Sequence, residues 1–219
     1  MAAKTTFRYT KKNSIIETPS FPSVDLTESE MALLFKFYIV EPPITRQSSK
    51  SVTLAERGWV GGFEKSGLKT KLDAICNLSD VICEPSSEAG AESLAELFSK
   101  RDLLDGPVGN LSEERAVITG KGESSSFLRL LRHIRNCFAH GNFLLQMNAD
   151  EDEVFVMEDR ETGRNPNVTA RMVLKKKTII AWAETIMRGS DGERRTESSN
   201  EIRHKTGCIF NENLERTNA

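Results

Sequence analysis

Residues 127–140 constrain this chain more than any other segment, because they keep one helical period without interruption. On a helix, at about 100° per residue, their apolar side chains fall on one side. These are Phe127, Leu130, Leu131, Ile134, Cys137 and Phe138. Serines at 124–126 give a start signal and Gly141 gives a stop. The pattern predicts a helix that buries one face in a core.

The opposite face of this predicted helix concentrates cations and histidines. It carries Arg129, Arg132, His133, Asn136 and His140, with Arg135 at its margin. One interpretation is the solvated side of an amphipathic helix, where arginines near the C-terminus are favoured by the helix dipole. The other is a functional site, because a histidine in the last turn can reach into a cleft and exchange protons near neutral pH.

The run from Leu131 to Gly141 resembles the signature of the HEPN superfamily (higher eukaryotes and prokaryotes nucleotide-binding), in which an Arg-Asn pair precedes a histidine. Arg135, Asn136 and His140 match its three polar positions, and Gly141 matches the glycine that often follows. The resemblance implies a mainly α-helical fold, a HEPN-like bundle over residues 27–187 that includes a C-terminal β-hairpin at 154–174 and a final helix. It also implies a homodimer whose facing helices form one composite site.

The activity that this resemblance implies is metal-independent RNA cleavage, with no cofactor. His140 would take the proton of a ribose 2′-hydroxyl, Arg135 would stabilise charge on the phosphate, and Asn136 would orient the site. Candidate RNA-binding residues are Arg129, Arg132, His133 and Asn142. For the first three, solvation or internal salt bridges is about as good an interpretation.

Charge and cysteine content narrow the range of functions and cellular compartments expected for this chain. The 219 residues include 30 basic and 32 acidic side chains, a net charge of −2, which argues against a general nucleic-acid coat or a polybasic membrane binder. The four cysteines show no Cys-x-x-Cys spacing, so we expect reduced thiols in a cytoplasmic protein. The longest apolar run, from Met31 to Val40, is too short to span a bilayer, so we expect no transmembrane segment. His133 and His140 lie two helical turns apart, about 10 Å, which is too far for one metal ion.

The rest of the chain gives weaker signals. Residues 1–26 read as an arm with one short alternation, Thr5-Phe7-Tyr9, that can pair as an edge strand. Thr27 and Glu30 form a capping-box pattern for a helix that ends before Pro42. The segment 44–62 reads as a loop that folds over the core through Trp59.

Further helices are predicted at 68–85, around 94–98, from Asn110 and at 177–187, and a hairpin is predicted from the runs 154–157 and 168–174. The polar residues 188–219 are expected to be disordered or to form a docking tail.

The leading hypothesis is therefore an endoribonuclease that acts as a toxin or antiviral defence component, with RNA as substrate and an antitoxin or regulatory protein as a further partner. The cellular role rests on analogy alone. The alternative is a non-catalytic module that binds RNA, a nucleotide or a protein partner. A third hypothesis is a structural subunit that recruits a partner through its tail.

Overall fold

The computed structural model describes residues 6–44, 47–86, 92–120, 123 and 125–190, and it shows a mixed α/β fold. Six strands form one sheet in the order β2-β3-β6-β5-β4, with β1 also pairing with β6. The strands are β1 (Phe7–Arg8), β2 (Ile82–Cys83), β3 (Arg115–Ile118), β4 (Phe143–Met147), β5 (Glu153–Arg160) and β6 (Asn167–Lys175). Only the β2–β3 pair is parallel among these strands.

The prediction of a mainly α-helical, HEPN-like bundle is therefore wrong. The predicted hairpin exists as β5 and β6, but it is the centre of a larger sheet. Strand β3 has only four residues, all buried, so it shows no alternation of apolar and polar positions. Strand β4 begins directly after the turn that ends the predicted motif helix, and its short apolar run gives no period of its own.

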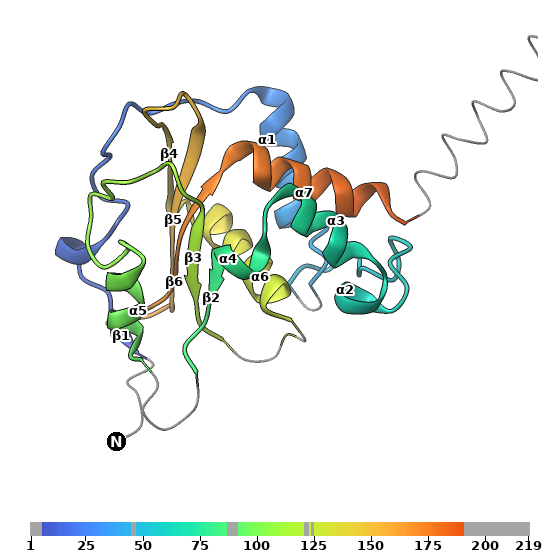
Figure 1. Ribbon diagram of the computed structural model, residues 1–219, viewed down its shortest axis with the longest axis horizontal. Coiled ribbons are helices and arrows are strands. Elements are labelled where there is room, and N and C mark those ends of the chain that lie inside the picture. The colour runs from blue at the N-terminus through green and yellow to red at the C-terminus, as the bar shows by residue number, and fades with distance from the viewer. Residues whose placement is uncertain (1–5, 45–46, 87–91, 121–122, 124, 191–219) are drawn as a thin grey trace, which may run out of the picture.

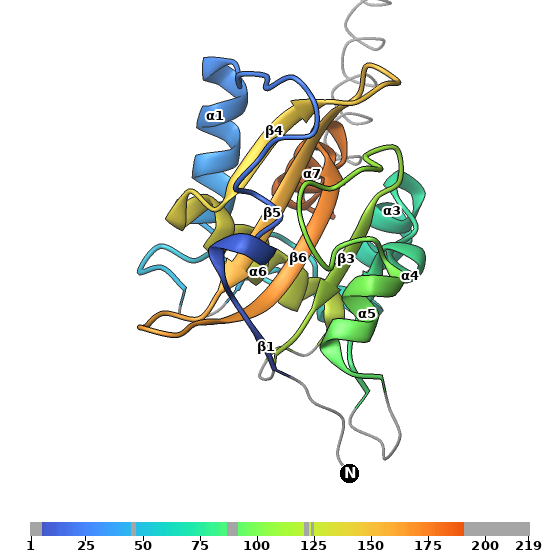
Figure 2. The ribbon, with the colours of Figure 1, turned by 90° about the vertical axis from the view of Figure 1, so that its left-hand side faces the viewer.

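Most of the helices cover one face of the sheet, and the N-terminal arm together with the helix Leu94–Lys100 covers the other (Figure 1). The helices are α1 (Glu28–Leu34), α2 (Gly62–Lys65), α3 (Leu68–Ile75), α4 (Leu78–Val81), α5 (Leu94–Lys100), α6 (Ser126–His140) and α7 (Lys176–Arg188). A π-helix (Phe35–Val40) extends α1, and a 3-10 turn (Lys11–Asn13) lies in the arm. Figure 2 shows the arm crossing the sheet on the side opposite α6 and α7.

Strand β5 shows why both faces need a cover. Phe155 and Met157 join the core cluster under α6 and α7, whereas Val154 and Val156 join the cluster under the arm and α5. Successive side chains of a strand point to opposite faces, so the uninterrupted apolar run of β5 requires burial on both sides. None of the described helices is both long and apolar enough to span a bilayer.

Several local predictions are confirmed. The Thr27 hydroxyl accepts a hydrogen bond from the Glu30 backbone N–H and so caps α1, and the Glu30 carboxylate accepts one from the Thr27 backbone N–H. The predicted motif helix is α6, the predicted last helix is α7, and β1 is the predicted edge strand. Trp59 is buried at 1% exposure, and its Nε1 donates to the Ile186 carbonyl at 3.1 Å.

Other local predictions are wrong. The single helix predicted over 68–85 is broken into α3, α4 and β2, and no helix begins at Asn110. The arm contributes to the core, because Ile15 is 1% exposed. The predicted tail lies outside the described residues from position 191 onward.

Candidate functional site

A polar pocket of about 490 Å³ lies beside the second half of α6, where the ends of three strands meet it. Its lining comprises Thr119, Gly120, Arg132, His133, Asn136, His140, Asp159, Arg160, Glu161, Thr162 and Thr169. Four of these residues come from the predicted face of α6, and the others come from β5, β6 and the segments that follow β3 and β5. The cationic face therefore lines a pocket rather than a uniformly solvated surface.

His133 is held rigidly at the back of this pocket. Its Nδ1 lies 2.6 Å from Asp159 Oδ2, and its Nε2 lies 2.5 Å from the Thr119 carbonyl oxygen. Both neighbours accept hydrogen bonds, so both ring nitrogens are satisfied when each carries a proton. With 3% exposure, the ring fastens α6 to β5 and to the end of β3, and it offers no nitrogen to an RNA phosphate.

The three polar residues of the motif do not all lie on the same side of α6. Asn136 lines the pocket and donates from Nδ2 to Asp159 Oδ2 at 3.0 Å. Arg135 does not line it; its guanidinium reaches Asn136 Oδ1 and the Gln47 carbonyl, both at 3.3 Å. His140 lies five positions after Arg135, which places the two residues about 140° apart around the helix axis. Arg135 and His140 therefore do not line the same pocket of this chain.

His140 is an exposed titratable group of the pocket. It is the last residue of α6 and is exposed, and it makes no hydrogen bond or ion pair with any described residue. Gly141 follows in a left-handed conformation with φ of 67°, which ends the helix and turns the chain into β4. The imidazole is thus accessible to a molecule that enters the pocket.

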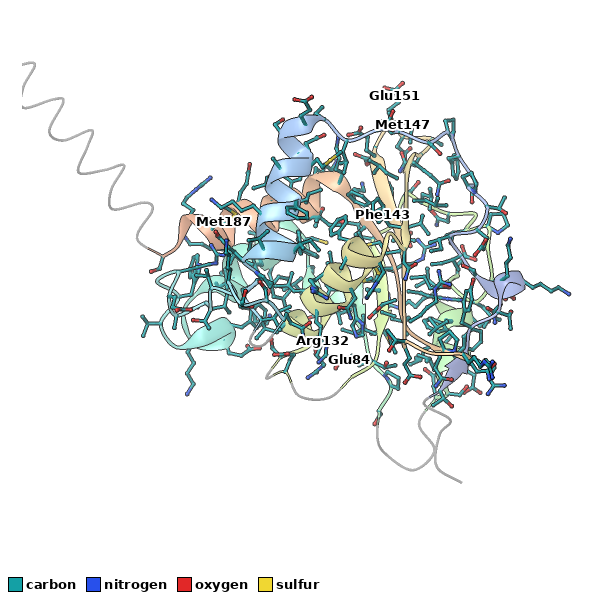
Figure 3. The ribbon with its side chains drawn as sticks, turned by 180° about the vertical axis from the view of Figure 1, so that it is seen from behind. Glu84, Arg132, Phe143, Met147, Glu151 and Met187 are labelled. Carbon is teal, nitrogen blue, oxygen red and sulfur yellow. The ribbon has the colours of Figure 1, made fainter. Side chains whose placement is uncertain are left out.

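The remaining predicted RNA-binding residues have different surroundings. Arg129 lies outside the pocket lining and binds Glu84 through two hydrogen bonds of 2.6 and 2.7 Å, which raise the pKa of Arg129. Arg132 lines the pocket, and its Nη1 lies 3.9 Å from Glu123 Oε1. Figure 3 labels Glu84 and Arg132 on this side of the molecule. Asn142 does not line the pocket, and its Oδ1 accepts a hydrogen bond from Arg160 at 3.2 Å.

Sequence reasoning missed Asp159 and Arg160, which complete the pocket from β5. The one available signal was that Glu158, Asp159 and Arg160 end an otherwise apolar run, but nothing in the sequence aligns that run with α6. Within the described ranges, no group of three or more His, Cys, Asp or Glu side chains is placed to hold a metal ion.

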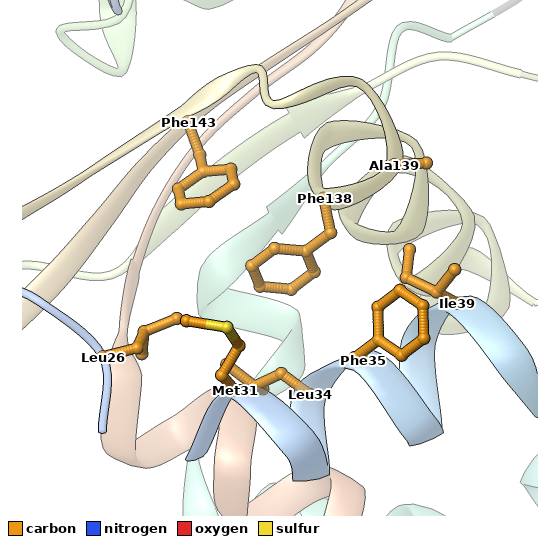
Figure 4. Close-up of a pocket in the computed structure, with 8 residues that line it drawn as sticks. All are labelled: Leu26, Met31, Leu34, Phe35, Ile39, Phe138, Ala139 and Phe143. Carbon is orange, nitrogen blue, oxygen red and sulfur yellow. The ribbon is translucent and has the colours of Figure 1, made fainter. Parts of the chain in front are cut away.

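A second, apolar groove of about 320 Å³ lies between α1, its π-helical extension and the end of α6 (Figure 4). It is lined by Leu26, Met31, Leu34, Phe35, Ile39, Phe138, Ala139 and Phe143. Met31 is 55% exposed and Phe35 is 58% exposed. Since Ala139 and His140 are consecutive, this groove reaches the same last turn of α6 as the polar pocket.

Comparison with known proteins gives no relative: no family model, no curated protein and no solved structure matches this chain.

Proposed function

We propose that this protein is a metal-independent endoribonuclease that cleaves RNA in the polar pocket around His140. One observation carries the proposal: the His140 imidazole, which makes no hydrogen bond to a described residue, lies in the same pocket as two arginines and an amide held in place by Asp159. A free imidazole can move a proton, and guanidinium groups stabilise the negative charge that develops on a phosphoryl group.

The proposed reaction begins with neutral His140 accepting the proton of a ribose 2′-hydroxyl. The 2′-oxygen then bonds to the adjacent phosphorus, the bond from phosphorus to the 5′-oxygen breaks, and an acid protonates that leaving oxygen. The products are a 2′,3′-cyclic phosphate and a 5′-hydroxyl. Arg132 would donate hydrogen bonds to the phosphoryl oxygens while charge accumulates there.

The acid in this scheme is the His140 of a second copy of the chain. His133 cannot fill that role, because both of its ring nitrogens are engaged. The exposed apolar groove at Met31 and Phe35 supports association at this end of α6, since burying such side chains is favourable and the groove shares the last turn with His140. We therefore propose a homodimer over this groove.

A second candidate function is RNA or nucleotide binding without cleavage, or the binding of a protein partner. It is favoured by the position of Arg135 outside the pocket and by the engaged ring of His133, which leave one accessible imidazole among the described residues of a single chain. A toxin or antiviral defence role in the cytoplasm, opposed by an antitoxin or regulatory protein, remains our proposal by analogy with the family that the motif resembles.

The test is cleavage of labelled RNA in excess chelator, with analysis of the fragment ends. We expect 2′,3′-cyclic phosphate ends, and a loss of about 10²–10⁴-fold in rate for His140→Ala. Arg164→Ala, an exposed arginine of the β5–β6 turn, is the control and should leave the rate unchanged. Cleavage that survives His140→Ala, or that requires added magnesium, would reject the mechanism.

The homodimer is tested separately by sedimentation. Phe35→Glu places a charge in the apolar groove without touching the polar pocket, so we expect it to shift the protein to monomers and to reduce cleavage. If Phe35→Glu remains dimeric and fully active, the second copy does not associate over this groove. If the active wild type is monomeric, the acid cannot be a second His140.

A further inference from the structure

Arg160 is the last residue of β5, and three groups lie against its guanidinium. Nη2 donates to Asn142 Oδ1 at 3.2 Å, and Nε lies 3.3 Å from Glu158 Oε1. The Cζ atom lies 3.9 Å from the ring centre of Tyr9, which comes from the N-terminal arm. The side chain is 18% exposed and lines the same pocket as His140.

The charge of Arg160 is only partly neutralised by these contacts. Glu158 is fully buried and already receives a hydrogen bond from Nε of Arg171 at 2.9 Å, with Nη2 of Arg171 at 2.7 Å. One carboxylate therefore faces two guanidinium groups, and Glu158 alone cannot neutralise both. Nη1 of Arg160 makes no hydrogen bond to any described residue, so its two N–H groups are left to donate.

The stacking on Tyr9 explains how such a cation stays in place. A planar guanidinium binds the face of an aromatic ring and keeps its edge donors free for other acceptors. Strand β1 of the arm, which ends directly before Tyr9, pairs with β6, so the ring is fixed to the sheet. Tyr9 also donates from its hydroxyl to Glu17 at 3.0 Å, which restrains the ring.

We propose that Arg160 is the principal phosphate-binding residue of the pocket and that the N-terminal arm positions it through Tyr9. The ligand is a phosphodiester of single-stranded RNA, so this inference rests on the proposed function for its substrate. It gives Arg160, which no sequence motif indicates, the role that the motif assigned to Arg135. Arg160 thereby faces the bound phosphate from β5 while His140 faces it from α6.

The experiment measures binding of a fluorescent single-stranded RNA at several salt concentrations, in a His140→Ala background so that the RNA stays intact. Arg160→Gln should weaken binding at least tenfold and reduce the slope of log affinity against log salt by about 0.7, the value for one phosphate contact on a single strand. Arg164→Gln, an exposed arginine after β5, should change neither quantity.

Tyr9 variants separate positioning from charge. Tyr9→Phe keeps the ring and should bind as the parent does. Tyr9→Leu removes the stacking surface and should weaken binding about two- to fivefold while keeping the salt slope, because the charge is still present. Arg160→Lys keeps the charge but loses the planar contact, so it should resemble Tyr9→Leu in affinity and slope.

The outcomes distinguish this inference from the nuclease proposal. If Arg160→Gln folds and binds with unchanged affinity and slope, Arg160 contacts no phosphate and the inference fails. If Arg160→Gln does not fold, Arg160→Met, which also removes the charge, is measured in its place, and unchanged affinity and salt slope overturn the inference. RNA that binds through Arg160 but is never cleaved by the wild type would leave the inference standing and reject the nuclease.

Discussion

Two successive carboxylates of β5, Glu158 and Asp159, point to opposite faces of the sheet and hold together two different regions of the molecule. Both are buried, with exposed fractions of 0% and 3%. On the arm side, Glu158 accepts a hydrogen bond from Ser14 Oγ at 3.1 Å and another from the Ile15 backbone at 3.4 Å, and it pairs with Arg171. It thereby fastens the arm to the sheet.

Asp159 instead organises the functional side. It accepts hydrogen bonds from His133 and Asn136, both on α6. His140 lies one turn after Asn136 and two turns after His133 on the same helix, and its side chain is free to reach the pocket. The comparison shows how the two-residue period of a strand lets adjacent residues serve separate purposes. One carboxylate stabilises the fold, and the other orients a site.

Removal of Glu158 should give the larger effect on stability. In Glu158→Ala the guanidinium of Arg171 stays buried without its partner, which costs about 3–5 kcal/mol of unfolding free energy. Desolvation already lowers the pKa of Arg171. Urea unfolding measures the loss, and the double variant Glu158→Gln with Arg171→Met should recover much of it. A loss below about 1 kcal/mol for Glu158→Ala would show that the pair does not hold the arm.

Replacement of Asp159 should cost less and act mainly on the pocket. Asp159→Asn keeps the size but removes the charge that faces His133, and we expect a loss of about 2 kcal/mol, typical of hydrogen bonds to charged groups. The control is Glu184→Gln, on the exposed side of α7. RNA cleavage should fall as well, because one carboxylate oxygen becomes an NH2 group that cannot accept, whereas His133, Asn136 and the Arg160 backbone N–H all donate to Asp159. If stability and cleavage both match the wild type, Asp159 does not organise the site.

The sequence predicts the elements of this fold better than their assembly. Helix α6 and the capping box at Thr27 are local features, so periodicity and cap chemistry suffice to find them. The sheet was missed because β3 and β4 are short and because pairing between distant segments leaves no local pattern. For the same reason His140 and Asn136 could be named as site residues, whereas Asp159 and Arg160 could not.

The sequence also does not show that Arg135 lies outside the pocket that Asn136 and His140 line. A helical period places Arg135 at the margin of the polar face, and only the packed structure shows that its guanidinium turns toward Gln47. The same holds for His133. Its residue type and its place on the polar face suggest a phosphate ligand, but its two internal acceptors come from Asp159 and Thr119, and the sequence does not show that these residues pack against α6.

A smaller effect is expected at Gly120, which adjoins the guanidinium of Arg132 on the functional side. A Cβ at this position would contact Arg132 Nη2, and the backbone φ of 142° is already unfavourable for other residues. Gly120→Ala should cost about 1 kcal/mol and displace Arg132, so RNA affinity should fall. Gly163→Ala is a matched control, with φ of 133° and no atom within 4 Å of the new Cβ. Equal RNA affinity in the two variants would exclude a role for Arg132.

Glu30 is a partly exposed carboxylate, unlike the buried Glu158 and Asp159 of β5. Its replacement should therefore have the smallest effect on the free energy of unfolding. The hydrogen bond from Lys176, together with that from the Thr27 backbone, lowers the pKa of Glu30 to about 2. A depressed pKa in the folded state stabilises the protein above the unfolded value of about 4.3, and this contribution is lost as pH falls toward 2. Glu30→Gln, which can still cap α1, should therefore destabilise by about 0.5–1 kcal/mol at pH 7.

That difference between Glu30→Gln and wild type should vanish by about pH 2, when unfolding free energies are measured across the range. Glu28→Gln is the control, since Glu28 lies in the same first turn but is exposed and makes no ion pair with a described residue. A pH-independent difference for Glu30→Gln would mean that packing, and not the charge of the carboxylate, accounts for its effect. Because Lys176 also pairs with Glu153 on β5, the same measurement tests whether α1 and the sheet are joined through that lysine.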